Sequence, residues 1–221
     1  MKMKYLGIDF AWSHNNFSAL TLLEENRLIE TVYLQTDQEI REYIKKQKPD
    51  FIAVDAALEV LNESGNRSIE NQVLKNFAKY KLGIYPINKK IMQKLYGGSR
   101  AEALFGELEA YPLRQKLFEV YTHTTILRCF TQDYVLPYKR KKGRTTPFIR
   151  EQLVALQNYL MGVVEGIESY PILEVKVKEL KVIEDKLDSI VCAYTLYLYQ
   201  QGLCEKYDEL LLIPTPQFTS I

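Results

Sequence analysis

The sequence has only three cysteines, and they are not spaced as metal ligands. Cys129, Cys192 and Cys204 lack the short separations typical of a zinc site. An odd number of cysteines in a chain without a recognisable secretory signal predicts reduced thiols and a cytoplasmic location. The cysteines therefore argue against both a disulfide framework and a thiolate-bound metal.

The chain also lacks an excess of charge of one sign and lacks long apolar runs. Its 29 Lys and Arg residues nearly balance 28 Asp and Glu residues, so no overall basic field attracts nucleic acid or a membrane. No apolar run approaches the length of a transmembrane helix, and we expect no membrane partner. Any preference for a polyanion must therefore come from a local segment.

Apolar residues are plentiful, and they predict a core. They make up 47% of the 221 residues, and the length favours a single domain over residues 1–221 with insertions. Two short apolar runs, 4–9 and 51–55, predict buried strands that end in Asp9 and Asp55. A helix between them would make the strands parallel neighbours, whose acids emerge at one edge of the sheet.

Two further strands and that helix are predicted between these runs. Residues 17–23 and 28–34 alternate as an antiparallel meander does. Thr36 and Glu39 have the spacing of a capping box for a helix that ends near Lys48. Mixed strand directions with flanking helices indicate an α/β fold.

The middle of the chain is mostly polar and helical in pattern. Residues 56–116, broken by glycines and prolines, predict a helical insertion instead of a separate domain. Residues 117–121 predict another central strand, which carries Glu119, and His123 just after it is interpreted as a loop histidine bonded to backbone. Residues 210–213 predict a late edge strand.

A basic run occupies residues 139–144, before a helix predicted over 147–164. Such a run is usually a solvated loop. The alternative is that it follows a phosphate backbone, because it falls between an acid-bearing strand and an acid-bearing helix. Both interpretations stay open at this point.

The last predicted helix begins near Glu184 and carries two acids beside its apolar stripe. Asp185 and Asp188 are three residues apart and lie one above the other. Paired carboxylates next to a buried face cost stability unless a cation or a proton relieves them. A helix start would explain Asp185 through the helix dipole, but it explains Asp188 less well.

The order of the predicted elements resembles the RNase H-like fold, a mixed five-stranded sheet with its first and fourth strands side by side at the centre. In that fold, acids from the first strand, the fourth strand and the last helix meet at one edge. Asp9, Asp55 and the pair Asp185 and Asp188 occupy those places. The Asp-x-x-Asp of the last helix resembles that of the RuvC-type Holliday-junction resolvases.

The whole chain is also similar to a bacterial and archaeal family described as predicted RNase H-like nucleases (domain of unknown function 429). The family usually has Pro and Ala where Thr122 and Ser189 stand here, and neither change removes an acid. The similarity is carried by short motifs at residues 7–11, 52–58, Arg67 with Glu70, 118–121, 139–150, 186–194 and 213–214.

The resemblance implies a metal-dependent nuclease or phosphodiesterase that acts on DNA or RNA with two Mg²⁺ or Mn²⁺ ions about 4 Å apart. Carboxylates are suitable ligands for such hard cations. Glu119 is an additional catalytic candidate that would orient water. The predicted metal ligands and catalytic acids are Asp9, Asp55, Asp185 and Asp188, and the predicted substrate-binding residues are Arg67, Lys139, Lys141, Arg144 and Arg150.

Two alternative functions belong to other classes. An ATP-dependent phosphotransferase, like the actin and sugar-kinase relatives of this fold, needs a glycine-rich turn after the first-strand acid, and residues 9–13 supply none. A catalytically idle module would bind nucleic acid or a protein and keep the acids as architecture. Only an activity or metal-binding measurement separates that module from a nuclease.

Overall fold

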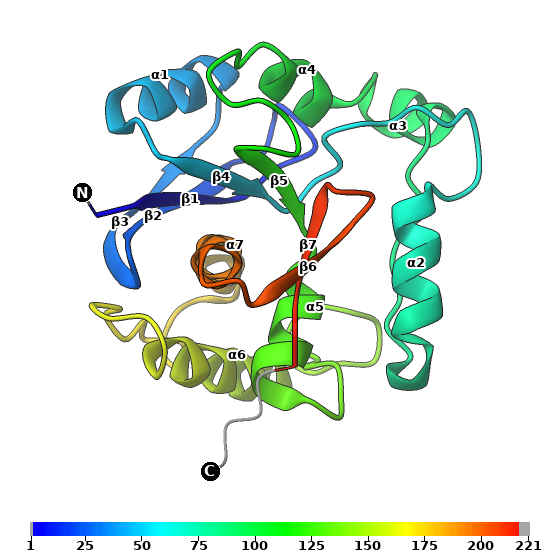
Figure 1. Cartoon of the computed structure of the whole chain (residues 1–221). Helices are drawn as coiled ribbons and strands as arrows, with labels where there is room; N and C mark the ends of the chain where they lie inside the picture. The colour runs from blue at the N-terminus through cyan, green and yellow to red at the C-terminus, as the bar shows by residue number, and fades with distance from the viewer. Residues whose placement is uncertain (1, 217–221) are drawn as a thin grey trace.

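The computed structural model describes residues 2–216, in which seven strands form one mixed sheet (Figure 1). The strands are β1 (Lys4–Asp9), β2 (Ser18–Glu24), β3 (Arg27–Leu34), β4 (Phe51–Val54), β5 (Leu117–Val120), β6 (Cys204–Tyr207) and β7 (Leu211–Pro214). Their order across the sheet is β3-β2-β1-β4-β5-β7-β6. β1, β2 and β3 form the antiparallel meander, whereas β4, β5 and β7 continue the sheet in parallel with β1.

The prediction of five strands was wrong, because the sheet gains two strands after the last helix. The segment 210–213 does form a strand, but β7 lies inside the sheet, between β5 and β6. β6 pairs antiparallel with β7 and covers that edge. Its sequence, Cys-Glu-Lys-Tyr, is short and half charged, so no apolar run signals it.

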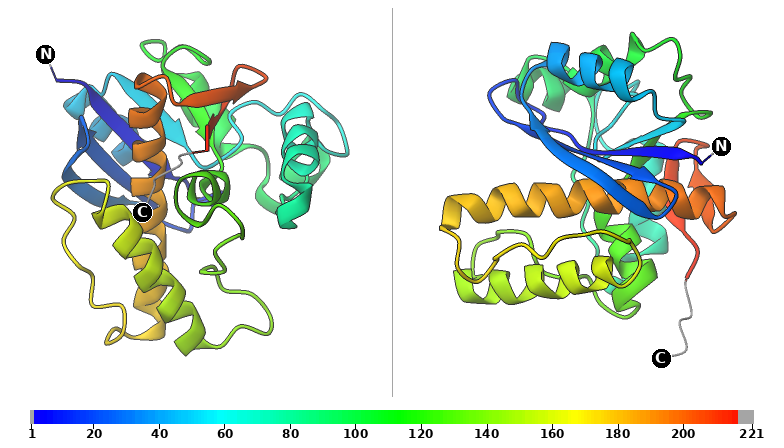
Figure 2. Two further views of the ribbon diagram at one scale, coloured as in Figure 1. Left: turned by 60° about the horizontal axis from the view of Figure 1, so that its bottom comes forward. Right: turned by 90° about the vertical axis from the view of Figure 1, so that its left-hand side faces the viewer.

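Helices cover both faces of the sheet (Figure 1). α1 and α4 lie on one face and α7 crosses the other, while α6 packs on the side of α7 that faces away from the sheet (Figure 2). The helices are α1 (Asp37–Gln47), α2 (Ser68–Asn76), α3 (Lys89–Tyr96), α4 (Arg100–Gly106), α5 (Thr122–Ile126), α6 (Thr146–Met161) and α7 (Val177–Gln200), with the short turns η1 (Ala78–Tyr80) and η2 (Leu127–Thr131). The predicted capping box of Thr36 and Glu39 is confirmed at the start of α1.

Two apolar cores lie on the two faces of the sheet, and β1 contributes to both. Leu6 and Ile8 pack with α1, α2 and α4, whereas Tyr5 packs with α6 and α7. Because strand residues alternate between faces, Gly7 and Asp9 face α7. An added Cβ at Gly7 would lie only 2.2 Å from backbone atoms of α7, so this glycine permits the helix to rest directly on the strand.

The last helix begins at Val177 and not near Glu184 as predicted. Its first turns mix charged residues with apolar ones, and Leu180 and Ile183 extend the buried stripe back beyond the predicted start. Glu179 accepts a hydrogen bond from the backbone N–H of Lys176 at 2.7 Å and helps to cap the true start. Asp185 therefore lies well inside the helix, and the helix dipole does not explain it.

Within residues 2–216, no helix combines the length and the apolar composition that crossing a membrane requires.

Candidate metal centre

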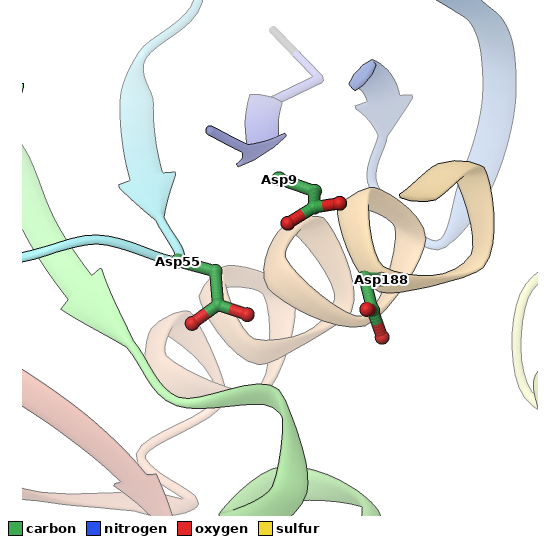
Figure 3. Close-up of side chains that lie close together, drawn as sticks. All are labelled: Asp9, Asp55 and Asp188. Atoms are coloured by element: carbon green, nitrogen blue, oxygen red, sulfur yellow. The ribbon is translucent and has the colours of Figure 1, made fainter. Parts of the chain in front are cut away.

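Three carboxylates meet where β1 and β4 end. Asp9 is the last residue of β1, Asp55 directly follows β4, and Asp188 lies on α7. One ligand oxygen from each lies within 4.8 Å of the other two, and Figure 3 shows the side chains approaching one another from these separate elements. The predicted convergence of these acids is confirmed, and the distances permit one shared metal ion.

The convergence follows from strand register and from one glycine. The N–H of Asp55 donates to the carbonyl of Ile8 at 2.8 Å, so Asp9 and Asp55 leave the two parallel strands next to each other. Both face α7 by strand alternation. The close approach of α7 at Gly7 then carries Asp188 over the same edge.

The three acids destabilise one another's charge. Burial, followed by the charge of Asp188, raises the pKa of Asp9 well above its usual value. Burial also raises the pKa of Asp55 to about 6, against the opposing effect of Lys139. Asp9 and Asp55 are partly exposed to solvent, but the surrounding protein still removes most of their hydration. The centre therefore favours a bound proton or a bound cation.

Asp188 is fully buried and only half satisfied. Its Oδ1 accepts a hydrogen bond from the hydroxyl of Tyr138 at 2.6 Å. Its Oδ2 lies 2.9 Å from the ammonium of Lys139, yet that contact lacks hydrogen-bond geometry, and Oδ2 receives no hydrogen bond from the described residues. A buried carboxylate oxygen held by an ion pair alone can exchange that ammonium for a metal cation, so it is a suitable ligand.

The residues present fit a hard divalent ion. Three carboxylates supply negative charge and oxygen ligands, which are the donors that Mg²⁺ and Mn²⁺ prefer. Lys139 forms an ion pair with Asp188, and its single charge does not neutralise three ionised carboxylates. The described acids that meet form one such group, which suffices to hold one ion.

Two hydroxyl side chains contact this region. The hydroxyl of Thr122 donates to Asp55 Oδ2 at 3.1 Å. The hydroxyl of Ser189 lies 2.7 Å from that of Thr21 on β2. The first contact orients a candidate ligand, and the second ties α7 to the sheet next to Asp188.

Asp185, the fourth predicted ligand, is not in the group of three. Its Oδ2 accepts a hydrogen bond from the hydroxyl of Tyr33 at 2.9 Å, and its Oδ1 accepts one from Lys181. Both oxygens are therefore engaged. Asp185 nevertheless lines the same cavity as Asp9 and Asp55.

Glu119 and Arg67 lie together, but on the other face of the sheet edge. Glu119 accepts two hydrogen bonds from Arg67 and a third from the N–H of Leu58, all at 2.7–2.9 Å. Arg67 makes five hydrogen bonds, to Glu119, Glu70 and the carbonyl of Glu59. A guanidinium has five N–H donors, so Arg67 has none left for a substrate.

Of the predicted basic substrate contacts, Lys139 alone pairs with one of the three acids. Arg144 donates to the carbonyl of Lys139 at 2.7 Å and shapes the loop. Arg150 bonds to the carbonyls of Ile172 and Val175, and Lys141 is exposed outside the cavity. The run is thus a solvated loop except at Lys139.

The interpretation of His123 as a backbone-bonded loop residue was wrong. His123 lies in α5, with its ring edge-on to Tyr121 and Tyr138. Its Nδ1 is buried and has no hydrogen-bond partner among the described residues. Burial lowers its pKa to about 4, so the imidazole is neutral at physiological pH.

Sequence analysis missed three polar residues around the acids: Tyr33, Tyr138 and Lys181. Lys181 precedes Asp185 by one helical turn, a spacing that would have predicted their ion pair had the helix start been placed correctly. Tyr138 adjoins the basic run, and no sequence pattern relates it to Asp188. Tyr33 comes from β3, and only the fold brings it to α7.

A family model described as a protein of unknown function (DUF429) matches residues 7–209. No curated protein matches the chain.

Proposed function

This chain belongs to the DUF429 family of proteins of unknown function, and we propose that it is a divalent-metal-dependent nuclease or related phosphodiesterase. The observation that carries the proposal is the meeting of Asp9, Asp55 and Asp188 within 4.8 Å. Three elements distant in sequence deliver these acids to one place, where Asp9 and Asp55 line a cavity and Asp188 is fully buried. The raised pKa of Asp9 and of Asp55 gives that arrangement an energetic cost, and perturbed acids in a cleft favour a functional site.

The strand arrangement supports an RNase H-like assignment within this proposal. The first and fourth strands are parallel neighbours, the first three form a meander, and the last long helix supplies an acid. The additional strands β6 and β7 extend the sheet at one edge without changing this central part.

We assign Asp9, Asp55 and Asp188 as the ligands of Mg²⁺ or Mn²⁺. When bound, such ions activate water and stabilise the oxygen that leaves the phosphorus atom. Thr122 orients Asp55, and Tyr138 orients Asp188. Asp185 is in reach of the cavity for a second ion, provided that its contacts with Tyr33 and Lys181 rearrange.

Lys139 has two tasks in this proposal. Without metal, its ammonium offsets part of the charge of Asp188. With substrate, it is the basic residue of segment 139–144 that lines the cavity, and it contacts the phosphate. The neighbouring Arg144 holds its backbone in place.

The test is cleavage of end-labelled DNA and RNA oligonucleotides, and of bis(p-nitrophenyl) phosphate, in Mg²⁺, Mn²⁺ or EDTA. We expect metal-dependent hydrolysis by the wild type and no hydrolysis by Asp9→Asn. Asp133→Asn, the same change at an exposed acid outside the cavity, should behave as wild type. Metal binding without hydrolysis of any of these esters would favour the idle binding module instead.

A further inference from the structure

Aromatic side chains surround the cavity that Asp9 and Asp55 line. The cavity has a volume of about 620 Å³, within the range of pockets that enclose small ligands. Its aromatic lining comes from two separate parts of the chain, one between Asp9 and Asp55 in the sequence and one after Asp55. These residues are Phe10, Trp12, Phe17 and Tyr33 from the first part, and Tyr85, Tyr96 and Tyr121 from the second.

Several of these rings are exposed to solvent. Phe17 is 46% exposed, Tyr96 is 41% exposed and Tyr85 is 84% exposed. Single exposed apolar residues are ordinary, but three exposed rings lining one cavity form a surface of the kind that marks a binding site. Their flat faces are available to another flat, apolar group.

The rings near the acids are held in fixed orientations. Phe17 stacks on Tyr33 with ring centroids 5.1 Å apart and planes 6° apart. The hydroxyl of Tyr33 donates to Asp185 at 2.9 Å, so the stacked pair is tied to the acid-bearing helix. Trp12 contacts Tyr96 with centroids 5.4 Å apart. A preorganised ring loses little entropy when it stacks on a ligand.

We propose that these aromatic residues form a base-stacking platform, so that the substrate is a single-stranded polynucleotide. This inference rests on the proposed function, which places a phosphodiester at the three acids. Stacking on aromatic side chains is how single strands are held without sequence preference. In a duplex the base faces are already covered by neighbouring pairs, so a platform of this kind selects unpaired nucleotides.

The cations of the cavity suit a strand that passes over the acids. Lys181 is 62% exposed at its side chain and lines the cavity together with Lys139. Both lie close to the acids, whereas the exposed rings Phe17 and Tyr85 come from other segments. Phosphates would therefore lie over the centre while the bases extend toward the aromatic rim.

The single tryptophan provides a direct measurement, because Trp12 is the only one in the chain and lines the cavity. Its fluorescence would be titrated with eight-nucleotide oligo(dT) and oligo(rU), and with a DNA duplex of equal length, in Ca²⁺. We expect the single strands to quench Trp12 and to bind at least about tenfold more tightly than the duplex. Comparison of dT with rU decides between DNA and RNA.

Phe17→Ala and Tyr85→Ala should each weaken single-strand binding by about fivefold or more. Tyr134→Ala changes a ring of similar exposure, 49%, that does not line the cavity, and should change binding less than twofold. Anisotropy of a labelled strand gives affinities independent of Trp12, and melting temperatures verify that each variant folds.

Equal affinity for single strand and duplex, or aromatic variants that bind as wild type does, would overturn the platform. That result is distinct from failure of the proposed function, which is the absence of metal-dependent cleavage. Single-strand binding that requires Phe17 without any cleavage would support the platform and contradict the nuclease. Cleavage that is unchanged in Phe17→Ala and Tyr85→Ala would support the nuclease and contradict the platform.

Discussion

Two clusters of acids lie beside the same cavity, which Glu70, Glu119, Asp9 and Asp55 line, but their charges are compensated differently. Glu119 and Glu70 share the guanidinium of Arg67, whose five donors are all used. In the cluster of Asp9, Asp55 and Asp188, Lys139 pairs with Asp188 at 2.9 Å, and one carboxylate faces two others. Burial alone does not separate the clusters. What separates them is how fully their charges are compensated, and on that criterion we interpret the first as structural and propose the second as a ligand site.

The largest expected effect is on activity. Asp9→Asn removes one of three ligands, and we expect hydrolysis to fall by about a thousandfold or more, because a metal ion supplies several kcal/mol of transition-state stabilisation. The same change removes a charge whose pKa is raised, so the melting temperature of the metal-free protein should stay unchanged or rise. Thermal unfolding in EDTA alongside a cleavage assay measures both. A clear drop in metal-free stability would identify Asp9 as structural.

Arg67→Met should have the opposite profile. It leaves Glu70 and Glu119 buried with no cation, and breaking a buried pair in this way costs about 3–5 kcal/mol. We expect the free energy of unfolding in urea to fall by about this amount, with Mn²⁺ affinity of the folded fraction unchanged. Lys89→Met, which breaks an exposed ion pair with Glu63, is the control and should cost under about 1 kcal/mol. Comparable losses in both variants would refute the contrast between the clusters.

The next largest expected effect is on the pH dependence of stability and of metal binding at Asp55. The pKa of Asp55 in the folded protein is about 6, above its ordinary 3.8. The proton on Asp55 therefore stabilises the folded state fully below pH 3.8, and this stabilisation is lost as the pH rises through 6. In metal-free protein, Asp55→Asn should therefore gain melting temperature over wild type between pH 4.5 and 7. Mn²⁺ affinity of the wild type should rise over the same interval, because the ion displaces protons. A pH-independent difference would contradict the raised pKa.

The smallest expected effect is that of replacing Lys139. Because Lys139 offsets the charge that attracts a cation, Lys139→Met should strengthen Mn²⁺ binding several-fold by calorimetry. It should also lower metal-free stability, since Asp188 then lies buried without a cation until it takes up a proton. Lys141→Met removes an exposed charge two residues away and should change neither quantity. Weaker Mn²⁺ binding by Lys139→Met would mean that the lysine organises the ligands.

The sequence contains most of the information that brings the acids together, but not all of it. Asp9 and Asp55 were predictable because each ends an apolar run, and parallel neighbours align their ends. Asp188 was predictable from its place on an apolar helix. The alternation of residues 117–121 also explains why Glu119 lies away from the three acids. Phe118 packs in the core on the α7 side and Leu117 in the opposite core, so Glu119 faces away from α7.

Other features depend on tertiary contacts that no local pattern encodes. β6 was missed because it has no apolar run, whereas the start of α7 was misplaced even though Leu180 and Ile183 continue the apolar stripe of that helix. Tyr138 and Asp188 are 50 residues apart, and Tyr33 and Asp185 are 152 apart. Arg67 was predicted to bind substrate from the family resemblance, which its motif with Glu70 carries, and only its five contacts show that its donors are used.

The central claim is that the under-compensated cluster binds metal and the compensated one does not. Crystals soaked with Mn²⁺ and measured for anomalous scattering test it most directly. We predict a peak coordinated by carboxylate oxygens of Asp9, Asp55 and Asp188, at about 2.1 Å as for a small hard cation, and its loss in crystals of Asp188→Asn. No peak between these three residues, or a peak at Glu70 and Glu119 instead, would contradict the account.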